Sequence, residues 1–162
     1  MTDDAIAAAV LTLCRARGWR VATAESCTGG LIAAALTAVA GSSDVVEGGF
    51  VTYSNAAKTA LLGVPAGLIE RVGAVSPEVA CAMAEGALAR LPATHLAVSV
   101  TGIAGPGGAT PGKPVGLVHF GLVRRGAPVE TRAEIFPGDR TAIRRATVLR
   151  ALAMLEAAAS LP

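Results

Sequence analysis

The sequence predicts a single α/β domain over residues 1–162, with a mixed parallel and antiparallel sheet between two layers of helices. Segments with helical spacing alternate along the chain with short apolar segments of strand character, as in three-layer α/β/α folds. The length of 162 residues suits one domain, and no repeat, linker or block of like charge divides it. Apolar residues make up 52% and charged residues 16%, a balance that excludes a disordered chain and requires a large core.

The first half of the chain predicts strands that alternate with short helices. Gly18 and Gly63 each follow an apolar helical pattern and are typical of a helix end, while Asn55 is suited to cap the helix that follows it. The expected helices span residues 3–17, 31–39, 56–62 and 65–71, and the expected strands span residues 20–24 and 49–53.

The second half contains the clearest helix start. Ser76, Pro77 and Glu78 supply a cap, a proline at the first helical position and an acid in the first turn, and Pro92 forbids continuation beyond about residue 90. Residues 96–101 are apolar on both faces, as in a central buried strand. The rest is expected to be a Pro/Gly loop at 106–114, an antiparallel hairpin of strands 115–123 and 129–136, and a helix from Arg140 to about residue 158 that Asp139 caps.

Charge, aromatic content and cysteine count narrow the class of protein. A net charge of +2 and 3% aromatic residues do not suit a nucleic-acid surface. Three cysteines without Cys-x-x-Cys spacing do not suit a disulfide framework or a zinc site. The N-terminus lacks a basic signal region, and Gly or Pro residues interrupt the uncharged stretches 26–43 and 91–112. We therefore expect a soluble cytoplasmic protein that contacts neither nucleic acid nor membrane, and so apolar a chain favours homo-oligomers.

The turn after the first strand is the first candidate for chemistry. Ser26 follows this strand directly, so the sharp turn would point its hydroxyl out of the sheet. The amides that come next lie at a helix N-terminus, where partial positive charge suits an oxyanion or a phosphate. The motif departs from the Gly-x-Ser-x-Gly hydrolase elbow at Ala24 and Thr28, and the alternative is that Ser26 or Thr28 only caps the helix. The residues of this turn are Cys27, Thr28, Gly29 and Gly30.

A nucleophilic serine needs a base, and Lys58 is the better candidate. It lies among Ala and Leu residues, where desolvation lowers a lysine pKa from about 10.4 toward the 7–8 that suits a base. Tyr53 precedes it by five residues, close enough to assist. The alternatives are a solvated surface lysine, and a triad using His95 or His119, neither of which has an obvious carboxylate partner. Cys27 is a rival nucleophile, although its neighbours do not favour a thiolate.

Two further motifs concern anions. Arg140, Arg144 and Arg145 crowd the start of the last helix, where positive charge opposes the macrodipole unless an anion binds there; the alternative is a solvated basic face. Residues 107–113 match the start of a phosphate-binding Walker loop, but Pro114 replaces the magnesium-binding Ser or Thr and a strand follows instead of a helix. We therefore expect an ordinary loop there.

Together these motifs resemble the C-terminal domain of the competence-associated CinA proteins, also known as the nicotinamide-nucleotide amidohydrolase family. The matching segments are residues 23–30, 49–55 with Lys58, 73–76, 99–106, 113–116 and 138–140 with Arg144 and Arg145. They follow one another over nearly the whole chain. The N-terminal domain that many members carry has no counterpart in this sequence, so the chain resembles the stand-alone form.

The resemblance implies hydrolysis of nicotinamide mononucleotide to nicotinate mononucleotide and ammonia, in pyridine-nucleotide salvage, without a metal ion or cofactor. It implies that Ser26 forms an acyl-enzyme, that Lys58 transfers the proton with help from Tyr53, and that Arg140, or else Arg145, binds the 5′-phosphate. The other implied substrate contacts are Cys27, Thr28, Gly29, Gly30, Asn55, Thr101, Gly102, Ala104 and Gly105.

Two other functions remain compatible with the same residues. The first is a non-catalytic nucleotide-binding or regulatory module that uses the same pocket. The second is a serine esterase with His95 or His119 as its base, which would stay active without Lys58.

Overall fold

The structure is a computed structural model that describes residues 2–162. Its sheet has five strands in the order β2-β1-β3-β4-β5. The strands are β1 (Val21–Glu25), β2 (Val46–Val51), β3 (Leu96–Gly102), β4 (Leu117–Arg124) and β5 (Glu130–Ile135). β2, β1 and β3 run parallel, whereas β4 and β5 pair antiparallel as a hairpin. The sheet is therefore mixed, as the alternation of elements in the sequence predicts.

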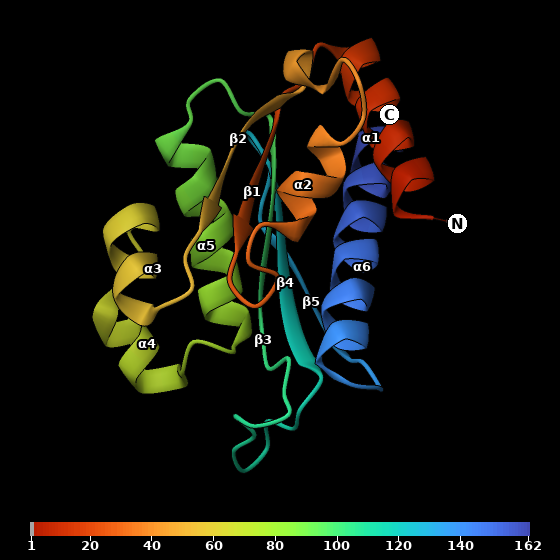
Figure 1. Cartoon of the computed structure of the whole chain (residues 1–162). Coiled ribbons are helices and arrows are strands. Elements are labelled where there is room, and N and C mark those ends of the chain that lie inside the picture. The colour runs from red at the N-terminus through yellow and green to blue at the C-terminus, as the bar shows by residue number, and fades with distance from the viewer. Residues whose placement is uncertain (1) are drawn as a thin grey trace.

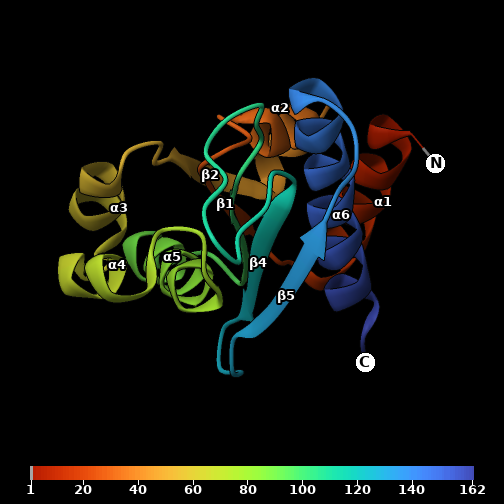
Figure 2. The same cartoon turned by 90° about the horizontal axis from the view of Figure 1, so that it is seen from below.

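Helices cover both faces of the sheet and complete a three-layer α/β/α arrangement (Figure 1). One face carries α1 (Asp3–Arg17), α2 (Leu31–Thr37) and α6 (Arg140–Ser160), and the other carries α3 (Asn55–Leu62), α4 (Ala66–Val72) and α5 (Pro77–Arg90). The view from below separates the same two groups and places β5 at the outer edge of the sheet (Figure 2). A short 3-10 turn, η1 (Ser42–Asp44), leads into β2. This confirms the predicted fold class.

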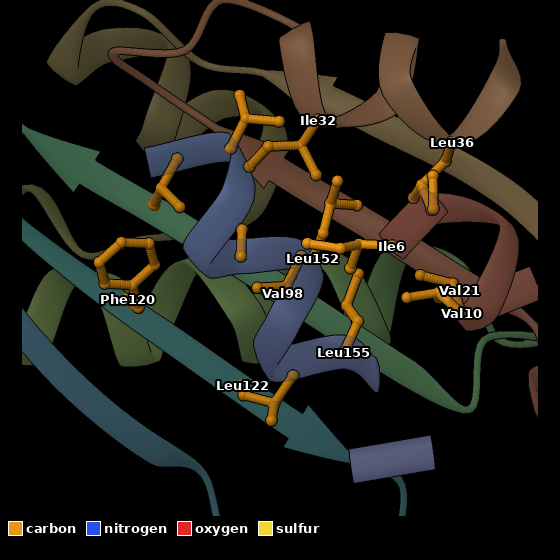
Figure 3. Packing of buried hydrophobic residues seen from close by; sticks show 14 of the residues in the cluster. Ile6, Val10, Val21, Ile32, Leu36, Val98, Phe120, Leu122, Leu152 and Leu155 are labelled. Carbon is orange, nitrogen blue, oxygen red and sulfur yellow. The ribbon is translucent and has the colours of Figure 1, made fainter. Parts of the chain in front are cut away.

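Small aliphatic side chains allow the layers to approach closely. On the α6 face, Leu152 and Leu155 pack in one cluster with Val98 and Leu122 of the sheet (Figure 3). On the α5 face, a Cβ atom on Gly121 of β4 would lie 2.5 Å from the carbonyl oxygen of Ala80, so only glycine fits there. Burial of this aliphatic surface is the main stabilising contribution to the sandwich, at about 25 cal/mol per Å².

The parallel strands bring their carboxyl ends to one edge of the sheet, which is where ligands bind in open α/β folds. All five residues of β1 are buried, and β3 is buried up to Thr101. The 103–116 loop extends from this edge, at the bottom of Figure 1. β1 and β3 therefore form a rigid base for whatever follows Glu25 and Gly102.

Several boundaries differ from the sequence-based expectation. β2 runs over 46–51 rather than 49–53, because Val46 already pairs with Val21 and the chain leaves the sheet after Val51. Ser54, not Asn55, caps α3, since its Oγ accepts the Ala57 amide at 3.0 Å. The smaller differences are one or two residues at the ends of β1, α4, β3, β4 and β5, with α2 ending at Thr37 and α6 continuing to Ser160.

Over residues 2–162, the search for a helix with the length and apolar character needed to cross a bilayer finds none.

Candidate active site

A pocket of about 300 Å³ opens at the carboxyl edge of β1 and β3. Four parts of the chain converge on it: the turn after β1, the start of α3, the segment before α5 and the loop after β3, with Arg140 of α6 at one side. The pocket is lined by Ser26, Cys27, Tyr53, Asn55, Lys58, Ala74, Val75, Thr101, Gly102, Ile103, Ala104, Gly105, Gly107, Gly108 and Arg140. Segments far apart in the sequence thus form one concave site.

A second, larger cavity of about 620 Å³ lies between α6 and the β4–β5 hairpin. Its described lining includes no Ser, Cys, Lys or His. In the part of the chain that the structure describes, no three His, Cys, Asp or Glu side chains come close enough together to hold a metal ion. The smaller pocket is therefore the place to look for chemistry.

Ser26 is held firmly at the end of β1. Its amide donates to the Val100 carbonyl at 3.2 Å, so the residue still pairs with β3 although the strand has ended. The chain then turns sharply through Gly29 and Gly30, whose φ values of 58° and 104° favour glycine, and enters α2. Ser26 itself is only 8% exposed. Its amide is thus anchored to the sheet, while the turn that follows it leaves the sheet.

The amine of Lys58 lies against this serine. Its Nζ is 2.9 Å from Ser26 Oγ, and it donates to the carbonyls of Thr52 at 2.8 Å and Tyr53 at 3.4 Å. Two carbonyl acceptors account for the two hydrogens of a neutral amine, so its lone pair is left for the Ser26 hydroxyl. The geometry therefore suits transfer of a proton from Ser26 Oγ to Lys58 Nζ.

Burial favours the neutral form of this amine. Lys58 is 1% exposed, and desolvation lowers the pKa of its amine from the ordinary value of 10.5. Lys58 takes part in none of the ion pairs formed by residues 2–162, so no carboxylate offsets the effect. The alternative of a solvated surface lysine is wrong.

The rival nucleophile and the rival bases are less well placed. Burial raises the pKa of the Cys27 thiol to about 11, which keeps it protonated at neutral pH. His95 lies before β3, at the opposite end of the sheet from Ser26, and its Nδ1 accepts the Arg20 amide at 2.9 Å. His119 lies within β4, opposite Thr101, and burial lowers the pKa of its imidazole. Neither histidine forms a hydrogen bond with Ser26 in the described chain.

Tyr53 and Arg140 meet at the mouth of the pocket. An Arg140 Nη donates to the Tyr53 hydroxyl at 2.9 Å, and the other donates to the Gly105 carbonyl at 2.8 Å. Tyr53 is 61% exposed, and it contacts Lys58 through its main-chain carbonyl. Its hydroxyl is therefore engaged with Arg140, not with Ser26 or the amine. The guanidinium forms no ion pair with a described carboxylate, so its charge stays available to an anion.

Not every expected contact lies at the pocket. The predicted residues Thr28, Gly29, Gly30 and Arg145 are absent from the described lining, and Arg145 is exposed on α6. Ala74, Val75, Ile103, Gly107 and Gly108 line it without having been predicted individually. Ala74 and Val75 reach the pocket because Thr101 Oγ1 donates to the Ala74 carbonyl at 2.8 Å. The only sequence signal for these two residues was the segment 73–76 that matches the family, because apolar side chains do not by themselves indicate a binding site.

A comparison with known protein families gives a match over nearly the whole chain. The model of the CinA C-terminal domain matches residues 3–159 of the chain. The chain belongs to this family.

Individual CinA relatives are similar over most of this chain. The CinA-like protein of Mycolicibacterium vanbaalenii is 58% identical over 141 residues, which are 87% of this chain and 33% of that protein. The chain spans about one third of the length of the curated relatives it matches. The competence/damage inducible protein CihA of Agrobacterium tumefaciens has a crystal structure with 51% identity and a TM-score of 0.92, covering 96% of this chain and 94% of that one. The competence damage-inducible protein A of Klebsiella pneumoniae is 39% identical with a TM-score of 0.93, covering 97% and 96%.

Proposed function

We propose that this CinA domain is an amidohydrolase that converts nicotinamide mononucleotide to nicotinate mononucleotide and ammonia, in cytoplasmic pyridine-nucleotide salvage. The observation that carries the proposal is the 2.9 Å contact between Ser26 Oγ and the buried Lys58 amine. A serine activated by a lysine is a known arrangement for acyl transfer. The choice of substrate comes from the family resemblance and from the guanidinium of Arg140, which lines the same pocket and forms no ion pair with a described carboxylate.

The reaction has two balanced steps. Ser26 Oγ attacks the carboxamide carbon while its proton passes to Lys58, and the amine then returns this proton to the departing nitrogen as the C–N bond breaks. Ammonia leaves and an ester to Ser26 remains. Water then attacks the ester, giving one proton to Lys58, which passes it to Ser26 Oγ as the acid is released.

The negative oxygen of each tetrahedral intermediate needs hydrogen-bond donors. The Gly29 amide already donates to the Ser26 carbonyl at 3.1 Å, and the Ile103 amide donates to the Leu117 carbonyl at 2.9 Å. We assign the oxyanion to the pocket amides that remain in residues 27–30 and 102–105, foremost those of Cys27 and Ala104, which line the pocket.

An ammonia-release assay tests the proposal. We expect the purified chain to release ammonia from nicotinamide mononucleotide much faster than from nicotinamide riboside or free nicotinamide. If the mononucleotide binds, as measured by calorimetry, but no ammonia appears, the chain is a non-catalytic binding module and the proposal is wrong. Hydrolysis of simple esters alone would favour an ordinary serine esterase.

Replacement of Arg140 by alanine should weaken binding of the mononucleotide selectively. A charge-assisted hydrogen bond to phosphate contributes about 1.5–3 kcal/mol, so we expect KM for the mononucleotide to rise about 10- to 100-fold. The riboside, which has no phosphate, should change little. Steady-state kinetics with both substrates check this. Equal losses on both substrates, or a selective loss in Arg145→Ala instead, would contradict the assignment.

The pH dependence of kcat/KM should report the Lys58 amine. Only its neutral form accepts the Ser26 proton, so the rate should rise with pH through the Lys58 pKa and then level off. Because desolvation lowers this pKa from 10.5, the midpoint of the rise should lie below that value. A rate profile is the measurement. A limb centred at the ordinary lysine value would show that Lys58 is not the base.

A further inference from the structure

Two charged side chains contact the Ser26 turn from outside the pocket. The first is Glu25, the residue before the nucleophile, which is 1% exposed. Its Oε1 accepts the Thr28 hydroxyl at 2.6 Å and the Ile32 amide at 2.9 Å, and its Oε2 accepts the Ala33 amide at 3.0 Å. The carboxylate therefore receives donors from the turn and from the first turn of α2.

The second side chain is Arg144 of α6, which meets the same turn with the opposite charge. Its Nε donates to the Cys27 carbonyl at 3.0 Å and one Nη donates to the Thr28 carbonyl at 3.2 Å. More than one hundred residues separate it from the turn in the sequence. Neither Arg144 nor Glu25 lines the pocket, so neither is placed to touch a substrate.

Glu25 and Arg144, which we together call the bracket, both form hydrogen bonds with the turn. The guanidinium donates to the carbonyls of Cys27 and Thr28 and so restrains the orientation of these two peptide groups. The carboxylate accepts the Thr28 hydroxyl and the first amides of α2, and so ties the Thr28 side chain to the start of that helix. The turn has little conformational restraint of its own. Gly29 and Gly30 give it unusual backbone freedom, and α2 has only seven residues, too few to be stable alone.

We propose that Glu25 and Arg144 are positioning residues that keep the Ser26 hydroxyl within hydrogen-bond distance of Lys58. The inference rests on the proposed function for its catalytic consequence, but the contacts themselves hold the turn and the helix start that follow the nucleophile. A displacement of about 1 Å at a reacting group can reduce a rate about 100-fold without removing any reacting atom. Loss of either half of the bracket should therefore slow acylation while substrate binding persists.

The test compares Glu25→Gln and Arg144→Gln with matched surface controls. Glu70→Gln and Arg71→Gln make the same chemical changes on the exposed side of α4, outside the pocket. A fluorophosphonate, whose phosphorus is attacked by an activated serine oxygen with loss of fluoride, gives two separate readouts: the fraction of protein labelled at Ser26 and the first-order rate constant of labelling. Partial unfolding lowers the labelled fraction, whereas a misplaced hydroxyl lowers the rate constant at full labelling.

We expect both bracket variants to label fully at rates about 10- to 100-fold below wild type, and both controls to label at the wild-type rate. Arg144→Lys should recover part of the rate, because an ammonium can reach one of the two carbonyls. Labelling of either bracket variant at the wild-type rate, or a loss confined to the labelled fraction, would overturn the inference. So would a wild-type Ser26 that does not label. The proposed function fails separately, if labelled wild type releases no ammonia from nicotinamide mononucleotide.

Discussion

Replacement of Lys58 by methionine should abolish ammonia release from nicotinamide mononucleotide. Methionine fills similar volume in the same buried position but supplies no lone pair for the Ser26 proton. General bases contribute about 10²- to 10⁴-fold, and here one amine would serve both as the base for attack and as the acid for the leaving group. We therefore expect kcat to fall by at least about 10³-fold. Stopped ammonia assays with purified variant and wild type measure this.

The Lys58→Arg variant distinguishes a role of Lys58 as a base from a role as a positive charge. Arginine keeps a cation beside Ser26 but stays protonated at all accessible pH values, so it should be as inactive as methionine. Substantial activity in the arginine variant would show that Lys58 acts by charge alone. Retention of activity in both variants would support the esterase alternative with a histidine base.

Burial of Lys58 should also lower the free energy of unfolding of the domain. Because burial lowers the Lys58 pKa in the folded state, the unfolded chain binds more protons between that pKa and 10.5. Stability therefore rises with pH across this window, and the destabilisation is greatest below it. Thermal unfolding should show a higher Tm for Lys58→Met than for wild type at neutral pH, with the difference shrinking toward pH 10.5.

Replacement of Ser26 by alanine should remove the reaction while leaving the ligand site. Without Oγ no acyl-enzyme forms, and loss of a nucleophile in a serine hydrolase costs on the order of 10⁶ in kcat. The change removes one atom from a side chain that is 8% exposed, so the pocket keeps its shape. Calorimetry should give a dissociation constant for nicotinamide mononucleotide within about threefold of the wild-type value. The Ser26 hydroxyl acts mainly in the transition state, so its loss leaves the contacts that bind the substrate in its ground state.

Mass spectrometry of the intact protein and of its proteolytic peptides provides the control for this prediction. A stalled acyl-enzyme on wild type, trapped at acid pH, should map to the peptide that contains Ser26 and should be missing from Ser26→Ala. If the adduct maps to Cys27, or if Cys27→Ala is the inactive variant, the nucleophile has been misassigned.

The fold was predictable from the sequence because its signals are local. Ser76 and Pro77 start α5 wherever the helix packs, and the apolar segment at 96–101 has no solvent-facing side in any arrangement. The exact strand limits were not predictable, since β2 begins where Val46 finds a partner in β1 and not where its sequence changes. The cap of α3 was misassigned to Asn55 because Ser54 and Asn55 are both good capping residues.

The site was predictable only in part. Ser26 and Lys58 carry a local signal, a serine after a strand and a lysine among aliphatic residues, and the structure brings them together. The choice between Arg140 and Arg145 depends on which face of α6 meets the 105 loop, which one helix alone does not reveal. Glu25 and Arg144 were missed as supports of the turn, because all but one of their partners are main-chain groups that every residue possesses.

The hydrogen bond from the Ser26 amide to the Val100 carbonyl has a consequence for thermal inactivation of the domain. Backbone groups that pair between two buried strands exchange their hydrogens only when the whole sheet opens, whereas surface loops open on their own. The nucleophile thus shares the protection of the most stable part of the molecule, while Tyr53 at the entrance does not. Inactivation by heat should accordingly coincide with the global transition and not precede it.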